Sequence, residues 1–225
     1  LALTDHHGLY GIVRFAEAAR AVGLPTVFGT ELTLTPGLDP MASVVLDERS
    51  TRSQVATGRV PDSHAADPAG RHLVLLADGP DGYARLAKAL SLGHLAGEKS
   101  APQFTLADVA GATAGDVWVL TGCRKGTVPA ALVDDGPAAA RRELNRLVDL
   151  FGRDRVLVEV WDHGDPLDLP RNDALVEVAI ASGVDVVATN NVHYAAPAQR
   201  PLATALAAVR ARRGLPELQP WLPAN

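Results

Sequence analysis

Residues 1–11 are Leu1-Ala2-Leu3-Thr4-Asp5-His6-His7-Gly8-Leu9-Tyr10-Gly11. A short apolar run that ends in an acid and two imidazoles, followed by a Gly-x-x-Gly turn, predicts a strand whose carboxyl end delivers polar groups into a pocket. Folds of the α/β class place their chemistry at such strand ends. Imidazole nitrogen and carboxylate oxygen together suit both metal binding and proton transfer. For the three polar residues taken alone, a solvated loop is the alternative.

The composition is that of a soluble globular protein. The 225 residues are 47% hydrophobic and 21% charged, and they include one cysteine, which excludes an internal disulfide. The formal net charge of -5 gives no overall attraction for phosphate backbones, so contact with nucleic acid would need a local patch or a partner. The sequence contains neither an apolar run of about 18 residues nor a signal peptide, so we expect a cytoplasmic protein without membrane contact.

Strand and helix patterns alternate along the rest of the chain. Apolar runs predict strands at residues 25–29, 72–77, 117–121, 156–161 and 184–188. Helical periodicity predicts helices at residues 12–22, 83–92, 137–151, 173–182 and 198–212, and Thr105 can cap a further short helix. This alternation predicts a mostly parallel sheet, open or closed into a barrel. The visible units are fewer than the eight of a complete (β/α)₈ barrel.

Candidate metal ligands gather where the predicted strands end. The residues just past a predicted strand are Asp5, His6, Glu31, Cys123, Asn191 and His193, whereas His72 starts its strand. Parallel strands would bring such residues into one crevice. Imidazole, carboxylate, amide and thiol groups together suit Zn²⁺, Mn²⁺ or Fe²⁺. Two or more such ions can bind a phosphate and turn a bound water into hydroxide.

Each of these residues also has a plain structural interpretation. His72 alone could be a capping or surface histidine, Cys123 a small buried hydrophobe, and Glu31 a solvated acid. The coincidence at several strand ends, rather than any single residue, carries the prediction. Glu159 and the polar pair 162–163 form one more cluster. We interpret it as part of a structural loop, with a hydrogen bond to a metal ligand as the alternative.

Several short motifs follow one another in a fixed order. They are Thr4-Asp5-His6, Gly8-Leu9-Tyr10-Gly11, Gly29-Thr30-Glu31, His72-Leu73-Val74-Leu75-Leu76-Ala77, Thr121-Gly122-Cys123, Trp161-Asp162-His163-Gly164-Asp165-Pro166 and Ala188-Thr189-Asn190-Asn191-Val192-His193-Tyr194. Together they resemble the polymerase-and-histidinol-phosphatase (PHP) domain family. The likeness is in particular to the PHP domain at the N-terminus of bacterial DNA polymerase III alpha-type subunits, and among these to the error-prone, damage-induced paralogue.

The resemblance implies one PHP domain over residues 1–225, folded as a distorted (β/α)₇ TIM-like barrel. It implies a metal site at the strand ends, with ligands at His6, Glu31, His72, Cys123, Asn191 and His193, and with Asp5 as a ligand or as the partner of one. The chain departs from the family pattern twice. It begins after the first strand and its His-x-His motif, and the family's Asp-x-His is here Asn191-Val192-His193. Both departures weaken metal binding, so we expect reduced occupancy by Zn, Mn or Fe.

Two functions are compatible with this resemblance. One is a module that supports an error-prone DNA polymerase in DNA repair or translesion synthesis, with a partly degenerate metal site. Its partners would be the remainder of the polymerase chain, DNA through the full-length protein, and other replication or mutagenesis proteins. The alternative is an active metal-dependent phosphoesterase, acting as a 3′-5′ exonuclease, a pyrophosphatase or a histidinol-phosphatase-like enzyme. The missing first motif and Asn191 favour the module, while the retained His6, Glu31, His72 and His193 favour the enzyme.

Residues 39–70 are rich in Pro, Gly, Ser, Asp and Arg and show no apolar period. We predict a flexible insertion there, whose deletion leaves the fold intact because it has nothing to bury. Thermal unfolding of the chain with and without these residues measures the effect. A large fall in the midpoint after deletion would show that the segment is a packed element.

Overall fold

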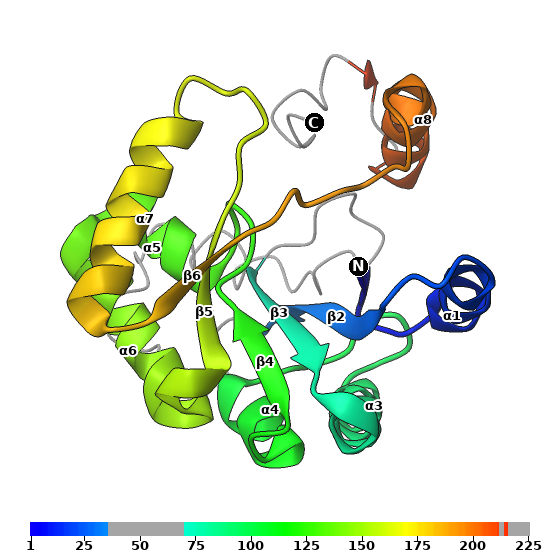
Figure 1. Cartoon of the computed structure of the whole chain (residues 1–225), viewed down its shortest axis with the longest axis horizontal. Coiled ribbons are helices and arrows are strands. Elements are labelled where there is room, and N and C mark those ends of the chain that lie inside the picture. Colours follow the sequence, from blue (N-terminus) through cyan, green and yellow to red (C-terminus); the bar gives the residue numbers. More distant parts are fainter. Residues whose placement is uncertain (36–69, 212–213, 216–225) are drawn as a thin grey trace.

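Six strands form one sheet in residues 1–35, 70–211 and 214–215, the part of the chain that this computed structural model describes (Figure 1). They are β1 (Ala2–His6), β2 (Val27–Leu34), β3 (Arg71–Ala77), β4 (Val117–Leu120), β5 (Val156–Val160) and β6 (Asp185–Ala188). The strands lie side by side in chain order. Apart from Gly70, the predicted insertion falls outside the described residues.

Strand β3 runs against its neighbours. It is antiparallel to both β2 and β4, whereas β1 and β2 are parallel to each other, and so are β4, β5 and β6. The prediction of a mostly parallel sheet is therefore confirmed, with one exception. His72 was predicted at the start of its strand, whereas the other candidate ligands follow theirs. Because β3 is reversed, its beginning lies on the side of the sheet where the other strands end, so His72 lies on the same side as those candidates. Thr33, near the end of β2, pairs with His72.

The sheet does not close into a barrel within the described residues. Strands β1 and β6 are its two edges, and each pairs with one neighbour. The prediction of a seven-stranded barrel is thus confirmed only in its coarser form, a mixed α/β fold. The prediction that β2 ends at Gly29 is wrong. Pairing with β3 extends β2 to Leu34, so Glu31 lies inside the strand rather than past its end.

Seven α-helices cover the sheet in the described part of the chain. They are α1 (Ile12–Ala21), α3 (Gly79–Ala96), α4 (Leu106–Thr113), α5 (Thr127–Asp135), α6 (Pro137–Phe151), α7 (Asp168–Ser182) and α8 (Arg200–Ala211), with 3-10 turns η2 (Arg153–Arg155) and η3 (Pro197–Gln199). The Thr105 hydroxyl caps α4 as predicted, accepting the Asp108 N–H at 3.1 Å. Helix α5 was not predicted, and α7 begins five residues before its predicted start. Pro129 and Pro170 lie in their first turns, where a missing N–H costs nothing.

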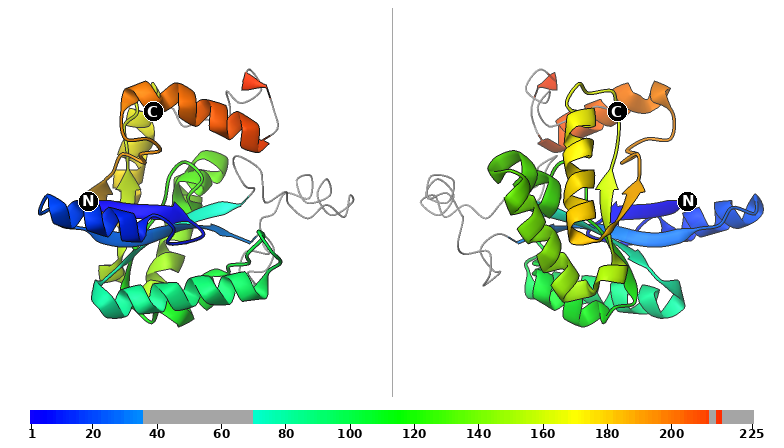
Figure 2. Two further views of the ribbon diagram at one scale, coloured as in Figure 1. Left: turned by 90° about the vertical axis from the view of Figure 1, so that its right-hand side faces the viewer. Right: turned by 60° about the vertical axis from the view of Figure 1, so that its left-hand side comes forward.

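The hydrophobic core lies between one face of the sheet and the helices. It joins strand residues such as Leu73, Leu75 and Val158 to helix residues such as Leu86 and Leu144. Side chains alternate along a strand, so the residues between these apolar positions project to the opposite face. Figure 2 shows α3 along one side of the sheet and α8 on the other, where its contacts are mainly with η3. Among the described helices, none combines the length and the apolar character needed to cross a bilayer.

Helix α3 offers a matched pair for testing the core. Leu86 is fully buried and Leu95 is 82% exposed. We expect Leu86→Ala to lower the free energy of unfolding by about 2–5 kcal/mol, because it removes buried methyl groups and leaves a cavity. We expect Leu95→Ala to change it by less than about 0.5 kcal/mol. Urea denaturation of both variants measures the difference, and equal effects would contradict the assignment of the core.

Candidate metal centre

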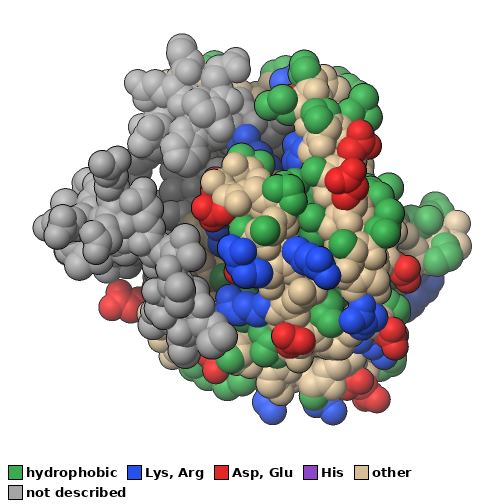
Figure 3. Space-filling model, turned by 90° about the vertical axis from the view of Figure 1, so that its left-hand side faces the viewer, with side chains coloured by type: hydrophobic (Ala, Val, Ile, Leu, Met, Phe, Trp, Pro, Cys, Tyr) green, Lys and Arg blue, Asp and Glu red, His purple; other side chains and the backbone are tan. Residues whose placement is uncertain are grey.

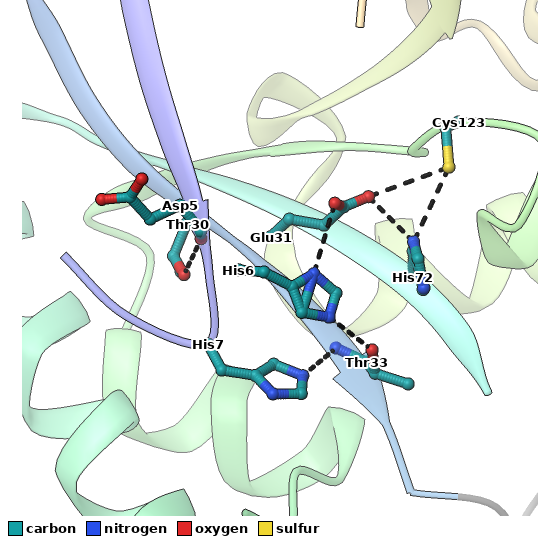
Figure 4. Close-up of polar contacts among 8 residues, drawn as sticks. All are labelled: Asp5, His6, His7, Thr30, Glu31, Thr33, His72 and Cys123. Atoms are coloured by element: carbon teal, nitrogen blue, oxygen red, sulfur yellow. Dashed lines mark hydrogen bonds and ion pairs between the residues drawn. The ribbon is translucent and has the colours of Figure 1, made fainter. Parts of the chain in front are cut away.

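Four side chains converge at the edge of the sheet where β2 ends and β3 begins (Figure 4). Glu31 Oε1 lies 2.9 Å from His72 Nδ1, and Glu31 Oε2 lies 3.4 Å from His6 Nδ1. Cys123 Sγ lies 3.8 Å from Glu31 Oε1 and 3.7 Å from His72 Nδ1. One ligand atom each from Glu31, His72 and Cys123 lie within 4.8 Å of one another. This group could hold a metal ion.

The loop after β4 turns tightly to present Cys123. The Gly126 N–H donates to the Cys123 carbonyl at 2.6 Å. A Cβ on Gly126 would lie 1.9 Å from the Thr121 carbonyl oxygen, so a side chain at this position would force the turn open. The His72 N–H donates to the Lys125 carbonyl at 2.9 Å, which ties the loop to the start of β3. The backbone therefore holds the thiol beside the imidazole.

Thr33 organises two neighbouring histidines, a role that the sequence analysis missed. Thr33 Oγ1 lies 2.8 Å from His6 Nε2, and the Thr33 N–H donates to His7 Nε2 at 2.9 Å. The second contact makes His7 Nε2 an acceptor and leaves its proton on Nδ1. Glu31 and Thr33 are two residues apart and share one face of β2. That alternation is the signal that could have found Thr33, had β2 been predicted at its full length.

Glu31 is the carboxylate that His6, His72 and Cys123 all contact. Burial opposes its ionisation, but the hydrogen bond with His72 and the nearby charges of His72, His6 and His193 outweigh burial. The pKa of the Glu31 carboxyl therefore lies below its ordinary value, and the group is ionised at neutral pH. An ionised carboxylate beside an imidazole and a thiol is a donor set that suits a borderline divalent cation such as Zn²⁺.

Four of the predicted ligands are not members of the group of Glu31, His72 and Cys123: His6, which contacts Glu31, and Asp5, Asn191 and His193. Asp5 turns away from it, since Asp5 Oδ2 accepts the Gly11 N–H at 2.6 Å and thereby orders the Gly-x-x-Gly turn (Figure 4). Asn191 is half-buried, with a left-handed φ of 41° that asparagine tolerates better than most residues. His193 is exposed, although its charge acts on Glu31.

The loop after β5 is held by Asp168, in agreement with its interpretation as a structural loop. The buried Asp168 carboxylate accepts the His163 N–H at 2.7 Å and pairs with Arg171 at 2.6 Å. His163 Nε2 donates to the Asn190 carbonyl at 2.8 Å. The loop therefore braces the segment that carries Asn191.

Glu159 lies inside β5 and is buried. Its Oε1 accepts a hydrogen bond from Thr189 Oγ1 at 2.5 Å. Its Oε2 is buried and has no hydrogen-bond partner among the described residues. Burial, together with the charge of Glu31, raises the pKa of the Glu159 carboxyl above its ordinary value, although the Thr189 hydroxyl and the Gly122 backbone N–H oppose this.

The fold and the site define an α/β domain in which a carboxylate, an imidazole and a thiol meet on one side of its sheet. Residues 1–163 match the PHP domain family, and the chain belongs to that family.

Relatives of much greater length match almost the whole of this chain. The error-prone DNA polymerase of Mycolicibacterium paratuberculosis is 48% identical over 223 residues, which cover 99% of this chain and 18% of that relative. DNA polymerase III subunit alpha of Thermus aquaticus is 28% identical over 98% of this chain and 16% of its own length. This chain thus spans less than a fifth of either relative. Among solved structures, an amidohydrolase from Chromobacterium violaceum has a TM-score of 0.48 and 17% identity, over 88% of this chain and 78% of that one.

His7 gives the fold a testable pH dependence. Burial, followed by the nearby imidazoles of His6, His94 and His72, lowers the pKa of His7 from 6.5 to about 3. Between these values the unfolded chain binds a proton that the folded chain does not, so this contribution to stability is complete above pH 6.5 and is lost as the pH falls.

We therefore expect His7→Gln, whose amide can still accept the Thr33 N–H, to lose less stability than wild type between about pH 7 and about pH 5. Urea denaturation across this range measures the slope. The exposed Glu17 on α1 provides the control, because Glu17→Gln leaves the groups around His7 in place and should keep the wild-type slope. An unchanged slope in His7→Gln would show that another group is responsible.

Proposed function

We propose that this chain is the PHP domain, over residues 1–225, of an error-prone DNA polymerase III alpha-type protein that acts in DNA repair or translesion synthesis. In this proposal the domain supports the polymerase structurally and binds at most one divalent metal ion tightly. The six-stranded sheet corresponds to part of a distorted (β/α)₇ barrel. The identity of 48% to an error-prone DNA polymerase over 99% of the chain supports the assignment.

The proposal of reduced metal binding rests on one observation: only some of the candidate ligands meet in one group. Glu31, His72 and Cys123 meet within 4.8 Å, which is enough for one ion. The segment after β6, by contrast, offers a neutral amide at Asn191 and an exposed imidazole at His193. Hydrolysis of a phosphate ester by this chemistry needs a second ion or a well-placed base as well as the first ion. A single ion fits a supporting role better than a catalytic one.

Contact with DNA is assigned to the remainder of the polymerase chain. Figure 3 shows the face that carries α5, α6 and α7, on which basic, acidic and apolar side chains are interspersed. The formal net charge of -5 gives no broad attraction for a phosphate backbone. Other replication or mutagenesis proteins would likewise meet this domain in the setting of the full polymerase.

Metal content and hydrolysis test this proposal. We expect the chain, equilibrated with Mn²⁺ or Zn²⁺ and then dialysed, to keep at most one ion, and to hydrolyse a generic phosphodiester at background rate. Asn191→Asp should tighten Mn²⁺ binding about tenfold, which corresponds to about 1.4 kcal/mol, because it adds an anionic oxygen. Turnover should rise much less than occupancy.

Two variants provide the controls. Glu31→Gln should abolish metal binding, because the carboxylate is shared by the cluster, while the exposed Glu17→Gln on α1 should leave it unchanged. Robust hydrolysis by the unmodified chain that disappears in His193→Ala would overturn the supporting role. The active phosphoesterase would then be the better assignment.

A further inference from the structure

Glu159 lies between the two segments that carry candidate ligands. In the β5–β6 register it pairs with Val187, and the β4–β5 register brings it level with Gly122, the residue before Cys123. Val156 and Val158 belong to the hydrophobic core, so the alternation along β5 turns Glu159 toward the opposite face. On β2 and β3, Glu31 and His72 occupy that same face, since Leu32 and Leu73 face the core. The Glu159 carboxyl therefore sits between the Cys123 loop and the Asn191 segment.

Only one of the two oxygens of the Glu159 carboxyl has a partner in hydrogen-bond geometry among the described residues. Glu159 is 6% exposed, and its Oε1 accepts the Thr189 hydroxyl. The Gly122 backbone N–H also acts on the carboxyl, yet Oε2 has no partner in hydrogen-bond geometry among the described residues. Such a buried oxygen is costly unless something binds it. The charge of Glu31 acts on the group as well and disfavours its ionisation. A divalent cation between Glu31 and Glu159 would bind the oxygen that has no partner. Its positive charge would also offset the repulsion between the two carboxylates.

We propose that Glu159 supplies an anionic oxygen to the metal centre, directly or through a bound water, and thereby replaces the charge that Asn191 does not provide. The inference rests on the proposed metal-binding function, and it adds a ligand from β5 to those from β2, β3 and the loop after β4. Glu31 and the Cys123 thiolate give the ion two negative charges, and Glu159 gives a third. Mn²⁺, which favours carboxylate oxygen, is the probe most sensitive to its loss.

The test is Mn²⁺ affinity, measured by competition with a fluorescent chelator, together with the Mn²⁺-induced rise in unfolding midpoint. We expect Glu159→Gln to weaken Mn²⁺ binding about 10- to 100-fold and to shrink the rise in midpoint. The midpoint without metal should not fall, because Gln keeps an acceptor for Thr189 and removes a buried acid. Adding Asn191→Asp to Glu159→Gln should restore most of the lost affinity.

Asp162→Asn is the matched control. Asp162 is an exposed carboxylate just after the same strand, so its loss removes one charge without touching the centre, and affinity should stay within about twofold. Thr189→Val separates ligation from positioning, since it breaks the hydrogen bond to Oε1 and keeps the carboxylate. A loss in Thr189→Val as large as that in Glu159→Gln would show that Glu159 only positions the β6 segment, and would overturn the proposal.

The remaining outcomes distinguish this inference from the proposed function. Equal Mn²⁺ affinity in wild type and Glu159→Gln, with binding abolished in Glu31→Gln, would overturn the role of Glu159 and leave the metal centre intact. If neither wild type nor Asn191→Asp binds Mn²⁺, the metal centre and the role of Glu159 both fail.

Discussion

The antiparallel register between β2 and β3 is the constraint on which the site depends. Thr33 pairs with His72, so Glu31 and His72 are diagonal neighbours on one face, and their side chains meet at 2.9 Å. A slip of one residue would turn His72 into the core and bring Leu73 out to the site, because side chains alternate along a strand. Leu73 and Leu75 are fully buried and oppose such a slip. Core packing and assembly of the site therefore impose the same register.

The electrostatics of the cluster favour binding of a cation. Glu31 is kept ionised by the imidazoles around it, and Cys123 can add a thiolate. His72 presents Nδ1 to Glu31, but its buried Nε2 has no hydrogen-bond partner among the described residues. Histidine ligands usually donate their second N–H to a carbonyl or carboxylate, which fixes the ring and raises its basicity.

Asn191 occupies an unusual backbone conformation in the segment after β6. Its φ of 41° lies in the left-handed region, where asparagine and aspartate are tolerated better than most residues. The neighbouring Asn190 carbonyl accepts a hydrogen bond from His163, whose loop is fixed by Asp168. Contacts outside the metal cluster thus help to hold this segment.

The sequence by itself determined the class of fold and most of the residues that meet. Apolar runs located the six strands, and helical periods with caps located α1, α3, α4, α6, α7 and α8, because these signals are local. Polar residues beside those runs identified His6, Glu31, His72 and Cys123, which the structure brings together.

Tertiary structure alone decided the direction of β3, the full length of β2 and the orientation of each polar side chain. The reversal of β3 explains how His72 reaches the site from the start of its strand. The pairing of β2 with β3 extends β2 as far as Thr33, which contacts His6. Asp5 looked like a ligand in the sequence, yet its carboxylate orders the turn at Gly11. Strand direction, pairing length and side-chain partners depend on contacts between residues far apart in the chain, and no local pattern records those contacts.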